Sequence, residues 1–95
     1  MSIVRAHVRV SGRVQGVGFR YSTQHVAREA GLGGWVRNLR GGGVEAVFEG
    51  EQADVDRVVE WCRHGPPGAR VENVDLEWET PSVEREFSIL TSVDI

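Results

Sequence analysis

The segment VRAHVRVSGRVQGVGFRYSTQHVAREAG, residues 4–31, decides the fold because it joins two different hydrophobic periods through a glycine-rich loop. Every second residue from Val4 to Val10 is apolar and the residues between them are charged or polar, which predicts a strand with one buried face. From Phe19 the apolar spacing becomes that of an amphipathic helix, which we expect to end at Gly31. A strand, a loop and a helix in this order predict the start of a mixed α/β fold.

The loop between this strand and this helix has the composition of an oxyanion-binding site. Glycines at positions 12, 16 and 18 permit backbone conformations that a side chain would block, so successive N–H groups can point at one spot. The helix N-terminus adds partial positive charge, and Arg20 adds a planar cation. The glycines alone are a weak signal, since the loop lacks both the full dinucleotide fingerprint and the Gly-Lys-Ser/Thr of a nucleotide P-loop.

The rest of the chain continues the alternation of strands and helices. The remaining predicted elements are strands at 35–38, 44–49, 73–79 and 87–89 and a helix at 53–64. The resulting order, β-α-β-β-α-β with a further short strand, predicts a ferredoxin-like α/β (α+β) sandwich. In this fold two helices cover one face of a mainly antiparallel sheet of four to five strands. We interpret residues 1–95 as a single domain with a frayed tail at residues 91–95.

Composition limits the classes of function. The 95 residues include 11 Lys and Arg and 14 Asp and Glu, a formal net charge of −3, so the basic excess of a nucleic-acid-binding protein is missing. One cysteine, Cys62, cannot form an internal disulfide, and its place in the apolar stripe of the second helix predicts a buried, inert thiol. The sequence has no leader-like segment and no long apolar run. We expect a cytoplasmic protein with neither membrane nor nucleic-acid partners.

The histidines and most of the arginines offer no clear chemistry. His7, His25 and His64 do not have metal-ligand spacing, so no metal site is predicted. We expect His25 to be exposed. From spacing alone, Arg5, Arg9, Arg13, Arg37 and Arg40 are interpreted as solvated charges.

Two strings of sequence together resemble the acylphosphatases, small hydrolases of carboxyl-phosphate mixed anhydrides. The first is GRVQGVGFR at residues 12–20, and the second is GWVRN at residues 34–38, followed by Gly42, Val44 and Gly50. The resemblance spans nearly the whole chain, and it implies the same ferredoxin-like fold that the periodicity predicts. The chain departs from the family at Gly41, where many members have Asp or Asn, and we expect a looser turn as a result.

The resemblance implies an enzyme that converts an acyl phosphate into a carboxylate and inorganic phosphate without metal or organic cofactor. Arg20 and Asn38 would be the catalytic residues, with Arg20 binding the substrate phosphate and Asn38 holding the attacking water. The phosphate would also be bound by backbone N–H groups of Gln15, Gly16, Val17, Gly18, Phe19 and Arg20. Because an arginine and an amide are poor bases, our hypothesis is that a phosphate oxygen of the substrate or bulk water accepts the proton.

Three alternatives stay open at this level. The chain could be a binding or regulatory module that has an oxyanion pocket without turnover. Acylphosphatase-like domains also begin larger hydrogenase-maturation enzymes that handle carbamoyl phosphate, but the zinc modules that follow in those proteins are missing from this sequence. Asn38 could be a turn-forming residue that hydrogen-bonds its own backbone. We expect a monomer, although the sequence leaves the oligomeric state open.

Overall fold

The computed structural model describes residues 2–92 and has the predicted order of elements. The predicted tail at residues 91–95 lies in part outside the described residues, at 93–95. The elements in chain order are β1 (Ile3–Arg13), α1 (Phe19–Glu29), β2 (Gly33–Leu39), β3 (Gly43–Glu51), α2 (Gln52–Cys62), β4 (Arg70–Glu79) and β5 (Phe87–Ile89).

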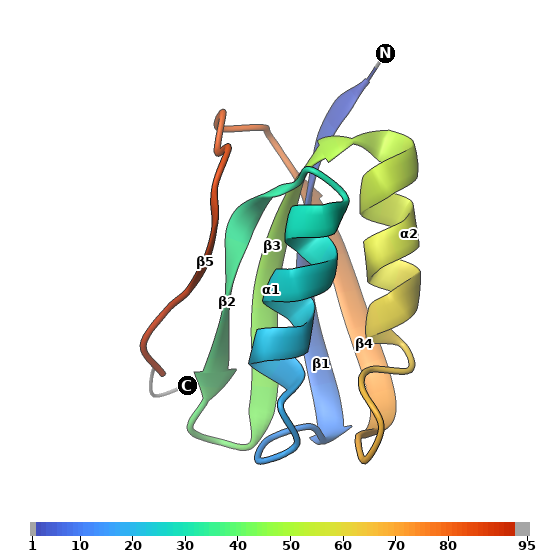
Figure 1. Ribbon diagram of the computed structural model, residues 1–95, viewed down its shortest axis with the longest axis vertical. Coiled ribbons are helices and arrows are strands. Elements are labelled where there is room, and N and C mark those ends of the chain that lie inside the picture. The colour runs from blue at the N-terminus through green and yellow to red at the C-terminus, as the bar shows by residue number, and fades with distance from the viewer. Residues whose placement is uncertain (1, 93–95) are drawn as a thin grey trace.

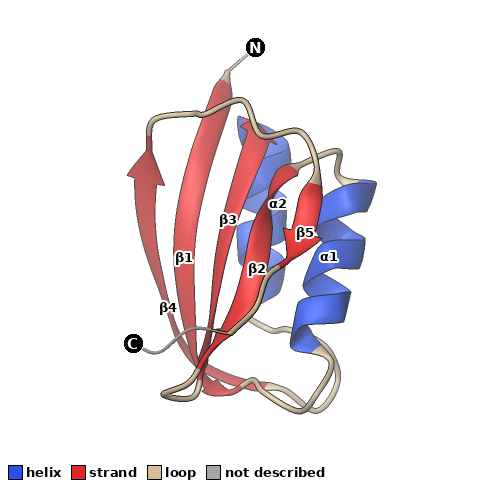
Figure 2. Cartoon of the chain, turned by 90° about the vertical axis from the view of Figure 1, so that its left-hand side faces the viewer, coloured by secondary structure: helices blue, strands red, loops and turns tan. Residues whose placement is uncertain are grey.

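The strands form one sheet in the order β4-β1-β3-β2-β5. The pairs β1–β3, β1–β4 and β2–β3 are antiparallel, and the short β5 runs parallel to β2. Both helices lie on the same face of the sheet, and among residues 2–92 no helix lies on the opposite face (Figures 1 and 2). The predicted ferredoxin-like sandwich is therefore confirmed.

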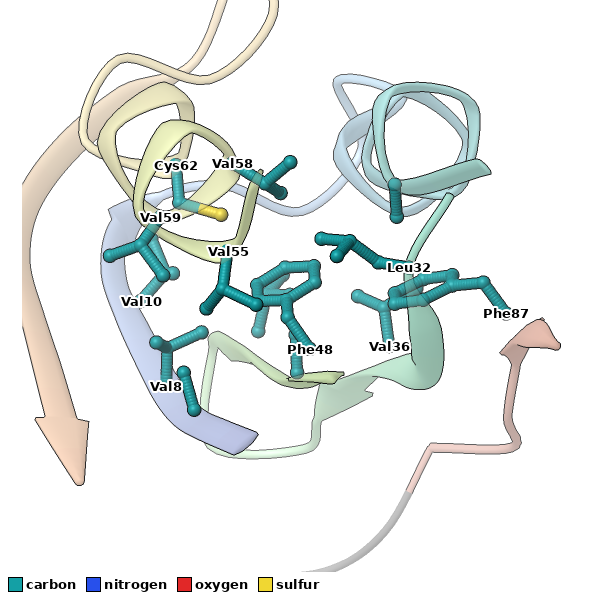
Figure 3. Packing of buried hydrophobic residues seen from close by; sticks show 14 of the residues in the cluster. Val8, Val10, Leu32, Val36, Phe48, Val55, Val58, Val59, Cys62 and Phe87 are labelled. Carbon is teal, nitrogen blue, oxygen red and sulfur yellow. The ribbon is translucent and has the colours of Figure 1, made fainter. Parts of the chain in front are cut away.

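The core lies between the sheet and the two helices (Figure 3). Phe48 of β3 and Phe87 of β5 stack with their ring centroids 5.5 Å apart, and valines from both helix and sheet surround them. Cys62 is fully buried in this layer, and burial raises the pKa of its thiol to about 12. The predicted burial of this cysteine is thus confirmed, and the raised pKa disfavours the thiolate, which is the nucleophilic form.

Gly12 belongs to β1 and not to the loop that follows it. The pairing of β1 with β4 shifts register between Ser11 and Gly12, and Gly12 has a φ of 118°. A Cβ at this position would lie 2.2 Å from the carbonyl oxygen of Arg70. This glycine therefore permits an irregular strand pairing, and the predicted loop is shorter at its N-terminal end than the sequence indicates.

The face of the sheet without helices carries two buried carboxylates that form ion pairs. Glu49, only 3% exposed, accepts hydrogen bonds from Arg5 Nη1 at 2.9 Å and from the backbone N–H groups of Ser82 at 2.9 Å and Glu84 at 3.0 Å. Arg5 also forms ion pairs with Glu79 and Glu84. The interpretation of Arg5 as a solvated charge is therefore wrong, because three carboxylates from different elements surround its guanidinium.

A second buried carboxylate is that of Glu45 on β3. It lies two residues before Val47 and on the same face of the sheet as Glu49. It is 2% exposed and accepts hydrogen bonds from His7 Nε2 at 2.6 Å and Arg37 Nε at 2.9 Å. Arg37 also lies over the ring of Trp35, 4.7 Å from the centroid. Burial alone would raise the pKa of Glu45, but its hydrogen bonds with His7 and Arg37 lower it. The solvated-charge interpretation is wrong for Arg37 as well.

Candidate active site

The strand order brings the two strings of sequence to one end of the molecule. Because β3 is antiparallel to both β1 and β2, those two strands run in the same direction and their C-terminal ends lie together. The loop from β1 to α1 starts at one of these ends, and the turn from β2 to β3 starts at the other (Figure 1). Residues 14–18 and residues 38–43 are thereby placed next to each other, although they are far apart in sequence.

The loop leads into α1 with an uncapped helix N-terminus. Gly16 and Gly18 have φ values of 75° and 77°, in the left-handed region that glycine adopts without strain. Gly18 is the N-cap residue, it provides no side-chain hydrogen bond, and the first turn contains no acidic residue. The first helical hydrogen bond runs from Ser22 N to Gly18 O at 3.0 Å. The positive end of α1 therefore has no negative group of its own.

The backbone N–H groups of residues 15–20 have no acceptor within residues 2–92, whether backbone or side chain. They lie between the end of β1 at Arg13 and the first hydrogen-bonded turn of α1, where no strand or helix pairing can use them. Such unpaired donors at a helix N-terminus are a favourable environment for an anion.

Arg20 is the second residue of α1 and is half-buried. Its guanidinium makes neither a hydrogen bond nor an ion pair with any residue that the structure describes. This differs from Arg5 and Arg37, whose guanidinium groups are held by buried carboxylates. The charge of Arg20, at the same helix end as the unpaired N–H groups, is therefore available to a ligand.

Asn38 lies within β2, one residue before its end. It pairs with Val44 of β3, and by strand alternation it shares the helix-covered face with the fully buried Val36. Its side-chain amide has no hydrogen-bond partner in the described part of the chain. The alternative of a turn-forming asparagine is not supported, because Asn38 is a paired strand residue whose amide points toward the side of the sheet on which α1 lies.

The side chain of Gln15 connects the two halves of this region, a contact that the sequence analysis does not predict. Its Nε2 donates hydrogen bonds to the carbonyl oxygens of Leu39 at 2.6 Å and Gly43 at 2.8 Å. Only the backbone N–H of Gln15 was expected to act. A glutamine in a loop does not indicate which groups it will bond, because the two carbonyl groups are provided by a turn far away in the sequence.

Comparisons with known proteins identify the family of this chain. A model of the acylphosphatase family matches residues 6–89. An acylphosphatase from Roseiflexus sp. is 59% identical over 91 residues, which cover 95% of this chain and 98% of the relative. The chain belongs to the acylphosphatase family.

Solved acylphosphatases have the same fold. The structure from Coxiella burnetii is 42% identical with a TM-score of 0.89 and covers 93% of each chain. The structure from Bacillus subtilis is 35% identical with a TM-score of 0.89 and covers 92% of this chain and 98% of the other. The predicted family, fold and class of enzyme, a hydrolase of acyl phosphates, are confirmed.

The remaining candidate groups of this acylphosphatase lie elsewhere. His25 is exposed on α1, as expected, with its Nε2 3.4 Å from Glu29. His7 lies on the helix-free face, between Glu45 and Glu79. No cluster of three or more His, Cys, Asp or Glu residues within 2–92 is placed to hold a metal ion. Over the same residues, neither helix is long and apolar enough to cross a membrane.

Proposed function

We propose that this acylphosphatase binds the phosphate of its substrate with Arg20 and the backbone N–H groups of residues 15–20, while Asn38 orients the attacking water. One observation carries the proposal. Six consecutive N–H groups, an arginine and an asparagine side chain, all without partners in the described chain, gather where β1 and β2 end. Unpaired donors of this kind are expected where a ligand completes the hydrogen bonding.

The donor set suits phosphoryl transfer from an activated substrate. The leaving carboxylate is a weak base and leaves without protonation, so catalysis can rest on positioning and on positive charge around the phosphoryl oxygens. Arg20 provides a full charge in a planar fork, and the helix end provides oriented N–H groups. We further propose a reaction that needs no metal, carried out by a cytoplasmic monomer without a nucleic-acid partner.

No side chain in the proposed site is a good general base. A guanidinium such as that of Arg20 offers only hydrogen-bond donors, and the amide of Asn38 can accept a hydrogen bond from water but cannot remove its proton. We propose that a phosphate oxygen of the substrate, or bulk water, takes the proton. The rate should then show no titration that disappears when His7, His25 or His64 is replaced singly.

The experiment that tests the proposal is hydrolysis of benzoyl phosphate in the presence of EDTA, followed by loss of ultraviolet absorbance. Arg20→Ala removes two charge-assisted hydrogen bonds of about 1.5–3 kcal/mol each, so kcat/KM should fall by about 10²–10⁴-fold. Competitive inhibition by inorganic phosphate should weaken in parallel. Arg13→Ala is the matched control, because Arg13 is an exposed arginine at the start of the same loop and should leave both values within about 2-fold.

Asn38→Ala should lower kcat by about 10²-fold and leave phosphate inhibition within about 3-fold, since the phosphate donors are intact. Asn73→Ala on β4 provides its control, because within the described chain the side chain of Asn73 bonds only to the exposed Asp75. Full activity of the folded Asn38→Ala variant would remove Asn38 from the mechanism. Loss of native activity on adding EDTA would contradict the proposed independence from metal.

A further inference from the structure

We propose that Gln15 is a positioning residue. Its side-chain amide holds the phosphate-binding loop at a fixed place relative to the β2–β3 turn and so sets the position of Asn38 relative to the bound phosphate. This inference rests on the function proposed above for Asn38. It concerns the side chain of Gln15, which has no part in the direct binding of phosphate by the backbone N–H groups.

The two acceptors of Gln15 lie opposite each other across the hairpin. Leu39 and Gly43 are the pair that ends the register of β2 with β3, and the carbonyl oxygen of Leu39 also accepts the N–H of Gly42 at 3.0 Å. Nε2 of Gln15 lies 2.6 Å from the first carbonyl oxygen and 2.8 Å from the second. The amide therefore joins the loop to both strands at the point where the hairpin closes.

The chemistry of these two carbonyl acceptors explains why an amide side chain suits position 15. Carbonyl oxygens only accept hydrogen bonds, and an uncharged amide nitrogen offers two donors at once. The orientation of the amide is also determined, because the opposite orientation would place its oxygen against two other oxygens. A glutamate at position 15 would repel both carbonyl groups in its ionised form, and a methionine of similar length would give neither hydrogen bond.

The link matters because the proposed site is divided between separate elements. The phosphate donors lie on the loop and the first turn of α1, whereas Asn38 is part of β2 and directly precedes Leu39. A change in the spacing of these elements moves the water relative to the phosphorus atom even if both elements keep their own structure. A misplacement of about 1 Å can lower a rate by about 10²-fold.

Gln15→Met tests the inference in the full chain with benzoyl phosphate as substrate and inorganic phosphate as competitive inhibitor. We expect kcat to fall by about 10–100-fold, while the inhibition constant of phosphate changes by less than about 3-fold, because Arg20 and the N–H groups remain. Gln24→Met is the matched control. Gln24 also donates from Nε2 to a backbone carbonyl, that of Phe87 at 3.4 Å, and its replacement should leave kcat within about 2-fold.

The double variant Gln15→Met/Asn38→Ala separates positioning from a general loss of structure. If Gln15 acts through Asn38, Gln15→Met should have little further effect on kcat once Asn38 is alanine, so the two effects should not add. Gln15→Glu gives a second readout if Gln15→Met does not fold. Its kcat should rise relative to native as the pH falls through the range where glutamate takes up a proton, because a protonated carboxyl group can donate one of the two hydrogen bonds.

Each of these measurements can overturn the inference. A kcat of Gln15→Met within about 2-fold of native, with Asn38→Ala strongly impaired, would reject the role of Gln15 and leave the proposed function intact. Full additivity in the double variant, or an equal loss of kcat and of phosphate affinity, would also reject it. If Asn38→Ala itself keeps full activity, the water-orienting role fails, and the positioning role of Gln15 fails with it.

Discussion

Replacing Glu49 by glutamine should test whether the buried carboxylates on the helix-free face stabilise the fold. The Glu49 carboxylate accepts hydrogen bonds from Arg5, Ser82 N and Glu84 N at 2.9–3.0 Å and is 3% exposed. These contacts hold the segment between β4 and β5, which crosses the end of the sheet in Figure 2. An amide has one oxygen instead of two, so at least one of the donors would face an NH₂ group.

The size of the effect can be worked from these contacts. A buried donor left without a partner costs about 1–3 kcal/mol, and breaking a buried ion pair by removing one partner costs about 3–5 kcal/mol. Arg5 keeps the carboxylates of Glu79 at 3.3 Å and Glu84 at 2.9 Å, so its charge would not be left alone. We therefore expect Glu49→Gln to lower the free energy of unfolding by about 2–3 kcal/mol, a fall in Tm of about 8–24 °C.

The effect should depend on pH with a definite sign. Burial alone would raise the pKa of Glu49, but hydrogen bonds from the N–H of Ser82, from Arg5 and from the N–H of Glu84 lower it below its ordinary value of 4.5. A carboxyl group whose pKa is depressed in the folded state stabilises the protein fully above the pKa of the unfolded chain. That contribution is lost as the pH falls through the folded-state pKa. The difference in free energy of unfolding between the native and Glu49→Gln proteins should be constant from pH 6 to 8 and shrink below about pH 4.5.

Urea unfolding followed by circular dichroism at pH 7 and at pH 4 measures both quantities. Glu72→Gln is the matched control, because Glu72 is an exposed glutamate on β4 and its replacement should change the free energy by no more than about 0.5 kcal/mol. The reasoning is refuted if Glu49→Gln is as stable at pH 7 as Glu72→Gln. It is equally refuted if the difference in free energy of unfolding between the native and Glu49→Gln proteins grows on acidification.

Two further predictions concern the glycine turn and the cysteine. Gly41→Asp should raise the free energy of unfolding by about 0.4–1 kcal/mol, whereas Gly42→Asp should lower it, because Gly42 has a φ of 109°. Thermal unfolding of both variants checks this, and an unchanged or lower Tm for Gly41→Asp would contradict it. Cys62 should react with iodoacetamide only under unfolding conditions, because it is fully buried and its thiol has a pKa of about 12. Rapid labelling of the native protein, measured by mass spectrometry, would contradict this.

The elements could be predicted because the signals that fix them are local. The alternation from Val4 to Val10 and the helical spacing after Phe19 reflect one buried face each, and the structure buries those faces. Gly12 shows where local reasoning stops. In the sequence this glycine is assigned to the loop, but in the structure it belongs to β1, has a φ of 118° and leaves no room for a Cβ beside Arg70 of β4. Only the register of two distant strands reveals that contact.

The ion pairs of the helix-free face could not be predicted for the same reason. A charged residue that alternates with apolar ones is expected to face solvent, and Arg5 and Glu49 both fit that pattern. In the structure β3 lies between β1 and β2, and Glu49 is held by the guanidinium of Arg5 on β1 and by two backbone N–H groups, those of Ser82 and Glu84, from the segment before β5. Glu49 is buried because of its position within the sheet, and local sequence patterns do not show that position.

In the candidate site, some features can be predicted from local sequence and others depend on contacts between distant elements. The strings that carry the resemblance contain Arg20 and Asn38, but nothing local places one beside the other. The two strings meet because the insertion of β3 between β1 and β2 makes these two strands parallel and brings their C-terminal ends together. The side chain of Gln15 then joins the loop to the turn through hydrogen bonds to two carbonyl groups of the β2–β3 hairpin. Residue types therefore suggest the groups that we propose to act, whereas the hydrogen-bonded connection through Gln15, on which we propose that the distance between phosphate and water depends, becomes visible only in three dimensions.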